Sequence, residues 1–111
     1  MKIDVRDGDD GVTHVVLDGR LDIEGVNAID MKMNVVAGSK HKVVIDLAGV
    51  DFMGSLGMRT LVVAAKTVAN KGGKLVLLQP QPNVDRALRT SGIDTVIPIA
   101  ADSVSAAALV S

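Results

Sequence analysis

Ser55 stands where a run of strand-forming residues meets a run of helix-forming residues, between Gly54 and Gly57. The apolar run Val43–Leu47 precedes it, and an apolar, helix-compatible run follows it as far as Lys66. A hydroxyl at such a junction can serve as a nucleophile, as the acceptor of a phosphoryl group, or as a cap for the helix. The neighbouring residues decide among these three roles.

Motifs that would make this serine catalytic are incomplete. A phosphate-binding P-loop needs Lys followed by Ser or Thr after its last glycine, but Met58 and Arg59 follow Gly57. The nucleophile elbow Gly-x-Ser-x-Gly would need a glycine where Met53 stands. Neither phosphate binding by a P-loop nor hydrolysis by an activated serine is therefore indicated.

The titratable residues give no catalytic or metal-binding pattern. The two histidines, His14 in a predicted strand and His41 in a predicted turn, have no reason to reach Ser55. The acidic turn at 7–11 lacks the terminal glutamate of a calcium loop and is expected to be a solvated hairpin turn. We therefore predict no catalytic residue, no metal site and no cofactor.

Two roles remain for Ser55. As the N-cap of a helix it would satisfy one unpaired backbone N–H, which is worth about 1 kcal/mol. As a phosphorylation site it would place nearly two negative charges at the positive end of a helix, where a phosphate is tolerated and where it would change whatever docks there.

The helix that follows predicts a binding face. At about 100° per residue, Arg59, Val62 and Lys66 lie within about 40° of Ser55, with Met58 beside them. The opposite face carries Leu61, Ala64 and Val68 and is expected to be the core. An apolar residue within the outward stripe is compatible with a docking surface.

Around this junction the sequence predicts alternating strands and helices. The expected strands are a short one at 3–5, one at 12–17 that continues extended to residue 22, and others at 42–47, 75–78 and 96–99; the expected helices are 23–38, 56–70, 82–91 and 103–110. Gly92 should end the third helix in a left-handed conformation, and Ser103 should cap the last one. The prediction is one α/β domain, 1–111, with an N-terminal hairpin, a mixed and mostly parallel sheet, and about four flanking helices.

Composition excludes several classes of function. The chain has one Phe and neither Tyr nor Trp, so it lacks aromatic platforms for stacking bases, and its net charge of −1 gives no basic footprint for nucleic acid. It has no cysteine, which excludes disulfides and fits a reducing compartment. No run approaches the roughly 20 apolar residues that span a bilayer. We expect a cytoplasmic domain without direct nucleic-acid binding and without membrane insertion.

Four motifs in order resemble the STAS family, the fold of bacterial anti-sigma-factor antagonists. They are Leu17-Asp18-Gly19-Arg20-Leu21-Asp22; Val43–Leu47 followed by Val50-Asp51-Phe52-Met53, a serine and a glycine opening a helix; Lys71-Gly72-Gly73-Lys74-Leu75; and Pro82-x-Val84-x-Arg86-x-Leu88 with Ser91-Gly92-Ile93-Asp94. The resemblance covers nearly the whole chain. The order of the motifs is more specific than any single one.

This resemblance implies a non-enzymatic switch that acts by binding proteins. In such antagonists the unphosphorylated protein binds an anti-sigma factor that is also a serine kinase of the histidine-kinase-like ATPase fold, and a sigma factor is freed. The kinase phosphorylates a serine at the start of the second helix, which breaks the complex, and a serine phosphatase reverses the reaction. Ser55 matches that serine. The matching partner-binding residues are Asp22, Gly54, Ser55, Leu56, Gly57, Met58, Arg59, Val62 and Lys66.

At one point the sequence departs from the family pattern. The usual Asp-Ser-Ser/Thr-Gly here reads Gly54-Ser55-Leu56-Gly57, without the acidic residue and without the second hydroxyl. Three hypotheses stay open: a phosphorylation-switched antagonist, a non-switching STAS interaction module in a larger signalling or transport complex, and an enzyme or small-ligand binder built around the serine. A monomer and a weak homodimer both fit the chain, since the N-terminal hairpin offers a free sheet edge.

Overall fold

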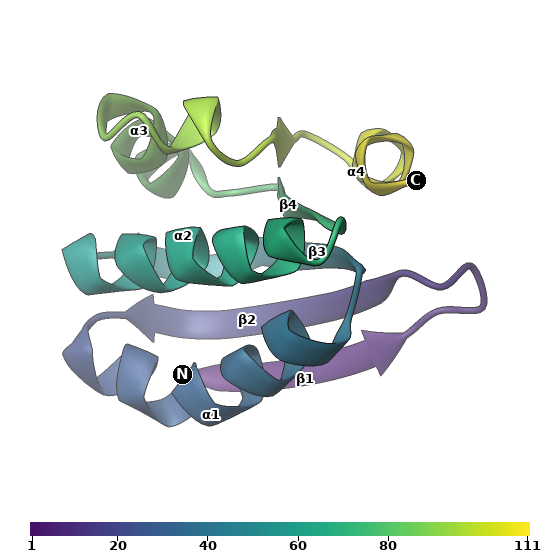
Figure 1. Ribbon diagram of the computed structural model, residues 1–111. Helices are drawn as coiled ribbons and strands as arrows, with labels where there is room; N and C mark the ends of the chain where they lie inside the picture. The colour runs from purple at the N-terminus through teal and green to yellow at the C-terminus, as the bar shows by residue number, and fades with distance from the viewer.

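In the computed structural model, which describes residues 1–111, strands and helices alternate along the chain (Figure 1). The strands are β1 (Lys2–Asp7), β2 (Thr13–Leu21), β3 (Lys42–Met53), β4 (Lys74–Leu78) and β5 (Ile99–Ala100); the helices are α1 (Ile23–Ser39), α2 (Ser55–Asn70), α3 (Pro82–Thr90) and α4 (Ser103–Val110), with a short 3-10 helix at Ile93–Thr95. None of these helices has the length and apolar character needed to cross a membrane.

The strands form one sheet in the order β1-β2-β3-β4-β5. β1 pairs antiparallel with β2 as a hairpin, whereas β2, β3, β4 and β5 run parallel to one another. Each parallel connection passes through a helix, as parallel pairing requires. The structure thus confirms the predicted mixed, mostly parallel sheet with an N-terminal hairpin and four helices.

Helices cover both faces of the sheet centre. On one face a large apolar cluster includes Val43 and Ile45 of β3 together with residues of α1, α2 and α3. On the other face Val44 belongs to a smaller cluster that includes Ala106 and Val110 of α4. Successive residues of β3 point to opposite faces, so the central strand is apolar on both sides, as its sequence predicts. Figure 1 shows α1 and α2 lying side by side over the near face.

β3 is longer than the sequence predicts. Its apolar run stops at Leu47, yet the strand continues to Met53 because β2 keeps pairing with it as far as Leu21. A register shift places Asp18 opposite Gly49 and carries the pairing past small residues that interrupt the apolar pattern. This extension brings the carboxyl ends of β2 and β3 together.

β5 is shorter than predicted, because residues 96–97 do not belong to it. Gly92 is left-handed as expected, with φ 77°. It starts a tight turn in which the N–H of Ile97 donates to the carbonyl oxygen of Ile93 at 2.8 Å. Backbone groups used locally cannot join a strand ladder, so pairing with β4 begins only at Pro98.

The N-cap of α4 is Asp102, and Ser103 is instead the first residue of the helix. The Asp102 carboxylate accepts a hydrogen bond from the N–H of Ser105 at 2.8 Å. This bond holds the pKa of Asp102 below its ordinary value. The predicted cap was therefore misplaced by one residue.

The Lys71-Gly72-Gly73 motif joins the end of α2 to the end of α1. The Lys71 ammonium donates to the carbonyl oxygens of Ala37 at 2.5 Å and Lys40 at 2.8 Å. A side chain on Gly73 would collide with the carbonyl oxygen of His41. The motif is thus explained by packing and capping in the fold.

Candidate functional site

The candidate site lies where β2 and β3 end and α1 and α2 begin. Leu21 and Met53 are paired at the ends of these parallel strands, so Asp22 and Gly54 follow side by side. The Gly54 N–H donates to the Leu21 carbonyl oxygen at 3.0 Å and joins the two segments beyond the ladder. Both helices begin at the same end of the molecule, on the left in Figure 1. The carboxyl ends of neighbouring parallel strands are where open α/β sheets place their functional loops.

Ser55 is the first residue of α2 and does not cap it. The N-cap is Gly54, in an extended conformation (φ −89°, ψ 178°), and no side chain accepts a hydrogen bond from the first turn. Ser55 is exposed to solvent. The interpretation of Ser55 as a helix cap is therefore wrong, because the helix starts one residue earlier than that role requires.

The start of α2 is electrostatically positive. Its first turn contains no acidic residue, and the unpaired N–H groups together with the helix dipole give this end a partial positive charge. Arg59 is exposed one turn further on, at the i+4 position from Ser55. A phosphate on the Ser55 hydroxyl would therefore meet a favourable local field.

Asp22 caps α1 beside this turn. Its Oδ1 accepts from the Gly25 N–H at 2.9 Å, and its Oδ2 lies 3.5 Å from the Nε of Arg20. The hydrogen bond from Gly25, helped by Arg20, holds the pKa of Asp22 below its ordinary value. The Arg20 guanidinium in turn lies over the Phe52 ring, 4.4 Å from its centroid. These contacts hold Asp22 and Phe52 in place at the mouth of the site.

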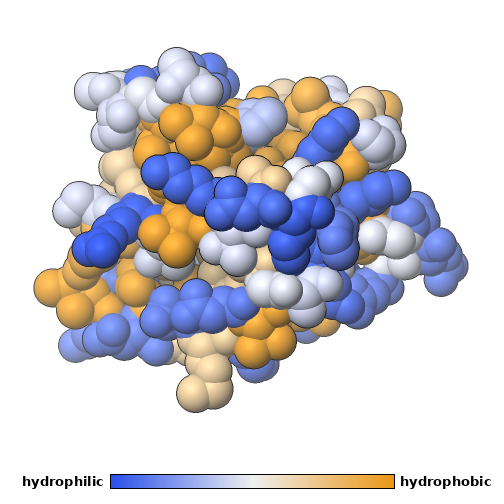
Figure 2. Space-filling model, viewed as in Figure 1, coloured by the Kyte–Doolittle hydropathy of each residue, from blue (hydrophilic) through white to orange (hydrophobic).

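Exposed apolar side chains surround Ser55. Ile23, Phe52, Leu56 and Val63, from three different elements, are between 38% and 65% exposed. A shallow hollow of about 280 Å³ is lined by Asp22, Ile23, Phe52, Gly54, Ser55 and Leu56. A second, of about 260 Å³ between α1 and α2, is lined by Asp30, Asn34, Leu56, Arg59, Thr60 and Val63. Together the two hollows, which share Leu56, form the Ser55 surface. Figure 2 shows apolar atoms at this left end of the molecule among hydrophilic ones.

The structure brings five of the predicted site residues to the Ser55 surface: Asp22, Gly54, Ser55, Leu56 and Arg59. Gly57 is buried beneath them. The predicted core face is also correct, since Leu61, Ala64 and Val68 are buried.

Two residues of the predicted outward stripe are placed differently. Met58 and Val62 are half-buried and pack against the main core, so they do not form an exposed apolar stripe with Ser55. Lys66 is exposed, but it lies eleven residues along the helix, about 16 Å from Ser55. The apolar part of the surface lies on the opposite flank of the helix, toward α1.

Three exposed residues were not found from the sequence: Ile23, Phe52 and Val63. Val63 lies about 80° from Ser55 around the helix, so a wider angular window would have included it. Phe52 lies only three residues before Ser55 in the sequence. Ile23, in contrast, becomes a neighbour of Ser55 only through the pairing of β2 with β3, which no local pattern reveals.

The histidines are remote from this surface. His41 comes directly before β3, whereas Ser55 follows its other end. His14 pairs with Val44, near the start of β3. Neither imidazole is placed to take a proton from Ser55. The chain has no group of three or more His, Asp or Glu side chains arranged to hold a metal ion.

The five-stranded sheet order, the N-terminal hairpin and the serine exposed at the start of α2 define a STAS-type α/β domain. The family model of the STAS domain matches residues 5–106, and the chain belongs to that family. The anti-sigma F factor antagonist of Paenibacillus polymyxa is 30% identical over 98 residues, which cover 86% of this chain and 84% of that protein.

Solved structures share the fold. The crystal structure of an anti-sigma factor antagonist from Mycobacterium paratuberculosis has a TM-score of 0.87 and 28% identity, covering 98% of this chain and 92% of that one. SpoIIAA, a Bacillus cell fate determinant solved in its phosphorylated form, has a TM-score of 0.73 at 19% identity, covering 96% and 97%. At that identity the second comparison shows a common fold alone.

Proposed function

We propose that the protein is an anti-sigma-factor antagonist that binds its anti-sigma factor through the Ser55 surface. The observation that carries the proposal is the exposure of Ser55 at an uncapped helix start, among Ile23, Phe52, Leu56 and Val63. Exposed apolar side chains grouped around a polar residue are typical of a protein-binding site. The names of the relatives supply the class of partner.

Phosphorylation of Ser55 is the proposed switch, with a partner that is itself a serine kinase of the histidine-kinase-like ATPase fold. The Ser55 hydroxyl oxygen attacks the γ-phosphorus of ATP, ADP leaves, and the hydroxyl proton passes to solvent or to a base of the kinase. A serine phosphatase restores the hydroxyl by hydrolysis and releases inorganic phosphate. The phosphorylated form solved for SpoIIAA makes this modification the first one to test in this chain.

The phosphate is expected to weaken binding to the partner and to leave the fold of this chain intact. Within the chain the phosphate lies at the positive end of α2, with no acidic neighbour in the first turn, so the helix is not disrupted. In a complex the same charge is desolvated among apolar side chains, and the helix end and Arg59 offset only part of a cost on the order of 3–5 kcal/mol. A cost of that size changes affinity by roughly 100-fold or more.

A second hypothesis rests on Gly54, which stands where antagonists of the family usually carry an acidic residue. If the kinase depends on that carboxylate, Ser55 is not a substrate, and the Ser55 surface serves a constant interaction in a larger signalling or transport complex. The binding site is the same in both hypotheses. They differ in whether the site is regulated.

Partner capture separates the two hypotheses. Wild type, Ser55→Ala and Ser55→Asp are used as baits in the native lysate, with Ser103→Asp as the matched control. Ser103 is also an exposed first residue of a helix, although α4 is capped by Asp102, so its substitution adds the same charge at a helix start away from the Ser55 surface. We expect an ATPase of the histidine-kinase-like fold with every bait except Ser55→Asp, and phosphate on Ser55 after incubation with that partner and ATP.

The other outcomes are equally informative. Capture of one partner by all four baits, without phosphate on Ser55, supports the non-switching module. Loss of binding in Ser103→Asp as well as Ser55→Asp shows that net charge, and not the Ser55 surface, controls binding. That result contradicts both hypotheses about the site.

A further inference from the structure

β1 leaves one side of the sheet without a neighbour. The sheet order ends at β1, so its outer backbone N–H and C=O groups have no strand to pair with. Its residues alternate: Ile3 and Val5 pack against the main core, whereas Lys2, Asp4 and Arg6 are exposed on the other face. Natural sheets commonly protect a free edge with charges that repel a second strand. Here the charges alternate in sign, and within one strand the Arg6 Nε donates to Oδ2 of Asp4 at 2.7 Å. An exposed pair of this kind contributes at most about 1 kcal/mol, so both charges remain available to an incoming strand in a suitable register.

A groove of about 450 Å³ follows this edge between β1 and α1. It is lined by Asp4, Val5, Met31, Lys32, Val35, Val36, Ser39 and Lys40. Met31 and Val35 are 82% and 64% exposed, the first being the most exposed large apolar side chain of the chain. This groove shares no residue with the Ser55 surface.

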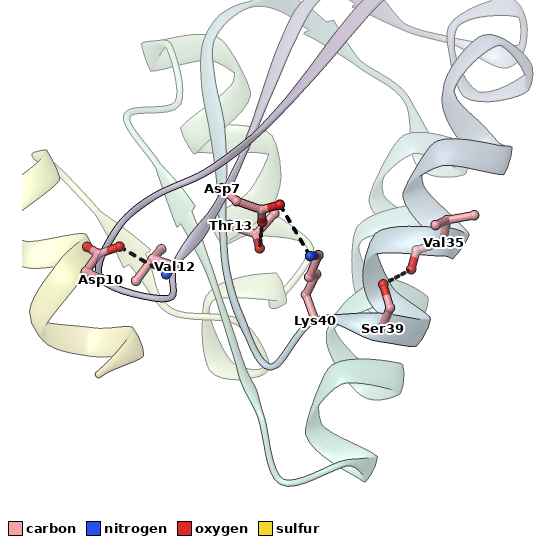
Figure 3. A network of polar contacts seen from close by, with 7 residues as sticks. All are labelled: Asp7, Asp10, Val12, Thr13, Val35, Ser39 and Lys40. Atoms are coloured by element: carbon pink, nitrogen blue, oxygen red, sulfur yellow. Dashed lines mark hydrogen bonds and ion pairs between the residues drawn. The ribbon is translucent and has the colours of Figure 1, made fainter.

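One end of the groove is fixed by ionic contacts (Figure 3). The Lys40 ammonium lies 3.3 Å from Oδ2 of Asp7, and the Thr13 hydroxyl donates to Oδ1 of Asp7 at 2.7 Å. These bonds tie the end of α1 to the hairpin at this end of the groove.

We propose that two copies of this chain associate through β1, as antiparallel strands related by a two-fold axis at Val5. In this register Asp4 of each copy lies opposite Arg6 of the other, which gives two pairs of opposite charge. Val5 faces its own counterpart, and Ile3 lies opposite Asp7, whose carboxylate is already held by Thr13 and Lys40. A dimer of this kind leaves both Ser55 surfaces free and does not depend on the proposed switch.

Two other registers keep the apolar faces on one side of the sheet, and each is disfavoured for a different reason. An axis at Asp4 opposes Asp4 to itself and Lys2 to Arg6, so every exposed pair has like charges. An axis at Ile3 opposes Lys2 to Asp4, but it moves the second copy about 13 Å along the strand, since four residues at ~3.3 Å separate the two registers. The grooves then no longer face each other, and Met31 stays uncovered.

The axis at Val5 also accounts for the exposed residues of α1. α1 lies over β1 and β2 on one face of the sheet, so a two-fold axis at the edge places the second α1 on that same face. Met31 and Val35 border the groove that contains Val5. The two grooves therefore meet across the axis, and each copy covers apolar surface of the other.

Charge reversal tests this register. Sedimentation equilibrium over a concentration series is measured for wild type, Asp4→Arg, Arg6→Asp, the double reversal, and an equimolar mixture of the two single variants. Each single variant opposes like charges twice, and we expect its dimer to weaken roughly tenfold. The double reversal and the mixture restore opposite charges, so both should recover wild-type association, the mixture as a heterodimer.

The groove is tested separately with Met31→Glu, and Val104→Glu is the matched control because Val104 on α4 is 81% exposed. We expect the first to weaken the dimer and the second to leave it unchanged, with equal thermal stability of both monomers. A wild type that stays monomeric at its solubility limit overturns the proposal. A dimer whose dissociation constant is unchanged by the single charge reversals overturns it as well. So does a mixture of the two single variants that forms no heterodimer.

Discussion

Gly57 lies against Leu21 so closely that a Cβ on Gly57 would stand 2.9 Å from the Leu21 Cβ and 3.0 Å from its carbonyl oxygen. The first turn of α2 therefore rests directly on the end of β2. Because Ser55 is two residues before Gly57, this contact sets the height of the serine above the sheet. It also gives a physical reason for the glycine that follows the serine in the motif.

Gly57→Ala should push the start of α2 away from β2. We expect the free energy of unfolding to fall by about 1–3 kcal/mol, as for other substitutions that overfill a packed site. Urea denaturation measures the change. Gly38→Ala is the control, because Gly38 is helical with no atom within 4 Å of its added Cβ, and alanine there should stabilise by about 0.5–1 kcal/mol. Equal stability of Gly57→Ala and wild type would show that Leu21 and the start of α2 can move apart at little energetic cost.

Gly54→Asp should stabilise α2 by capping it. Gly54 has an extended conformation open to any residue, and an added Cβ would come no closer than 3.4 Å to another atom. A carboxylate there can accept from the first turn and meets the positive helix end, so we expect a gain of about 0.5 kcal/mol. Gly54→Ala adds the carbon without the acceptor and should be less stable than the aspartate variant. The reverse order in urea denaturation contradicts the capping argument.

Leu56 should be the main apolar anchor of the Ser55 surface, because both hollows share it. Leu56→Ser is expected to lower affinity for the captured partner at least about tenfold. Its free energy of unfolding should fall by about 1–2 kcal/mol, since more than half of the side chain is buried, so the variant stays folded. Val104→Ser is the control, because Val104 on α4 is 81% exposed and its loss removes more exposed apolar surface than the loss of Leu56 does. Titration calorimetry that finds equal losses in both variants would place the interface elsewhere.

The sequence predicted the fold wherever local patterns decide it. β3 and β4 read as buried strands because β-branched and leucine residues occupy both faces, and α2 read as a helix because its buried residues recur at helical spacing. The errors fall where tertiary contacts override local preference. Pairing with β2 extends β3 to Met53. Residues 96–97 do not join β5, because their backbone groups form hydrogen bonds within the turn after Gly92.

The site was predicted in part, for a similar reason. Arg59 follows from helical geometry, and Ser55 and Leu56 follow from the family motif, whereas Ile23 joins them only through the β2–β3 register. The direction of the binding face was misjudged because the position of α1 cannot be read from α2. A helical wheel of α2 gives only the angles of its side chains around the helix axis. Which side of α2 stays exposed depends on where α1 packs.

The capping carboxylate of Asp22 should make stability depend on pH. Its folded-state pKa lies below the ordinary value of 3.8, mainly because of the hydrogen bond from Gly25. A depressed pKa contributes stability that is fully present above the unfolded-state pKa and is lost as pH falls through the folded-state pKa. Asp22→Asn keeps a capping oxygen but does not titrate. Below about pH 4, urea midpoints of the wild type should therefore fall more steeply than those of the variant, and parallel curves would contradict this.

The Lys71 ammonium should stabilise the C-terminus of α1, which has no basic residue of its own in the last turn. It donates to two carbonyl oxygens there, from Ala37 and Lys40. Lys71→Met keeps the aliphatic stem and leaves those acceptors without a charged donor, so we expect a loss of about 2 kcal/mol in the free energy of unfolding.

Lys74→Met is the matched control for this change. The Lys74 ammonium is exposed and donates only to the Ser111 oxygen, at 3.1 Å, so its loss should cost less than about 0.5 kcal/mol. Lys71 lies at the far end of α2 from Ser55, and Lys71→Met should bind the captured partner as tightly as wild type does. A variant of full stability and reduced affinity would assign Lys71 to a binding surface, whereas the expected result makes the Lys-Gly-Gly motif part of the scaffold that positions α1 beside α2.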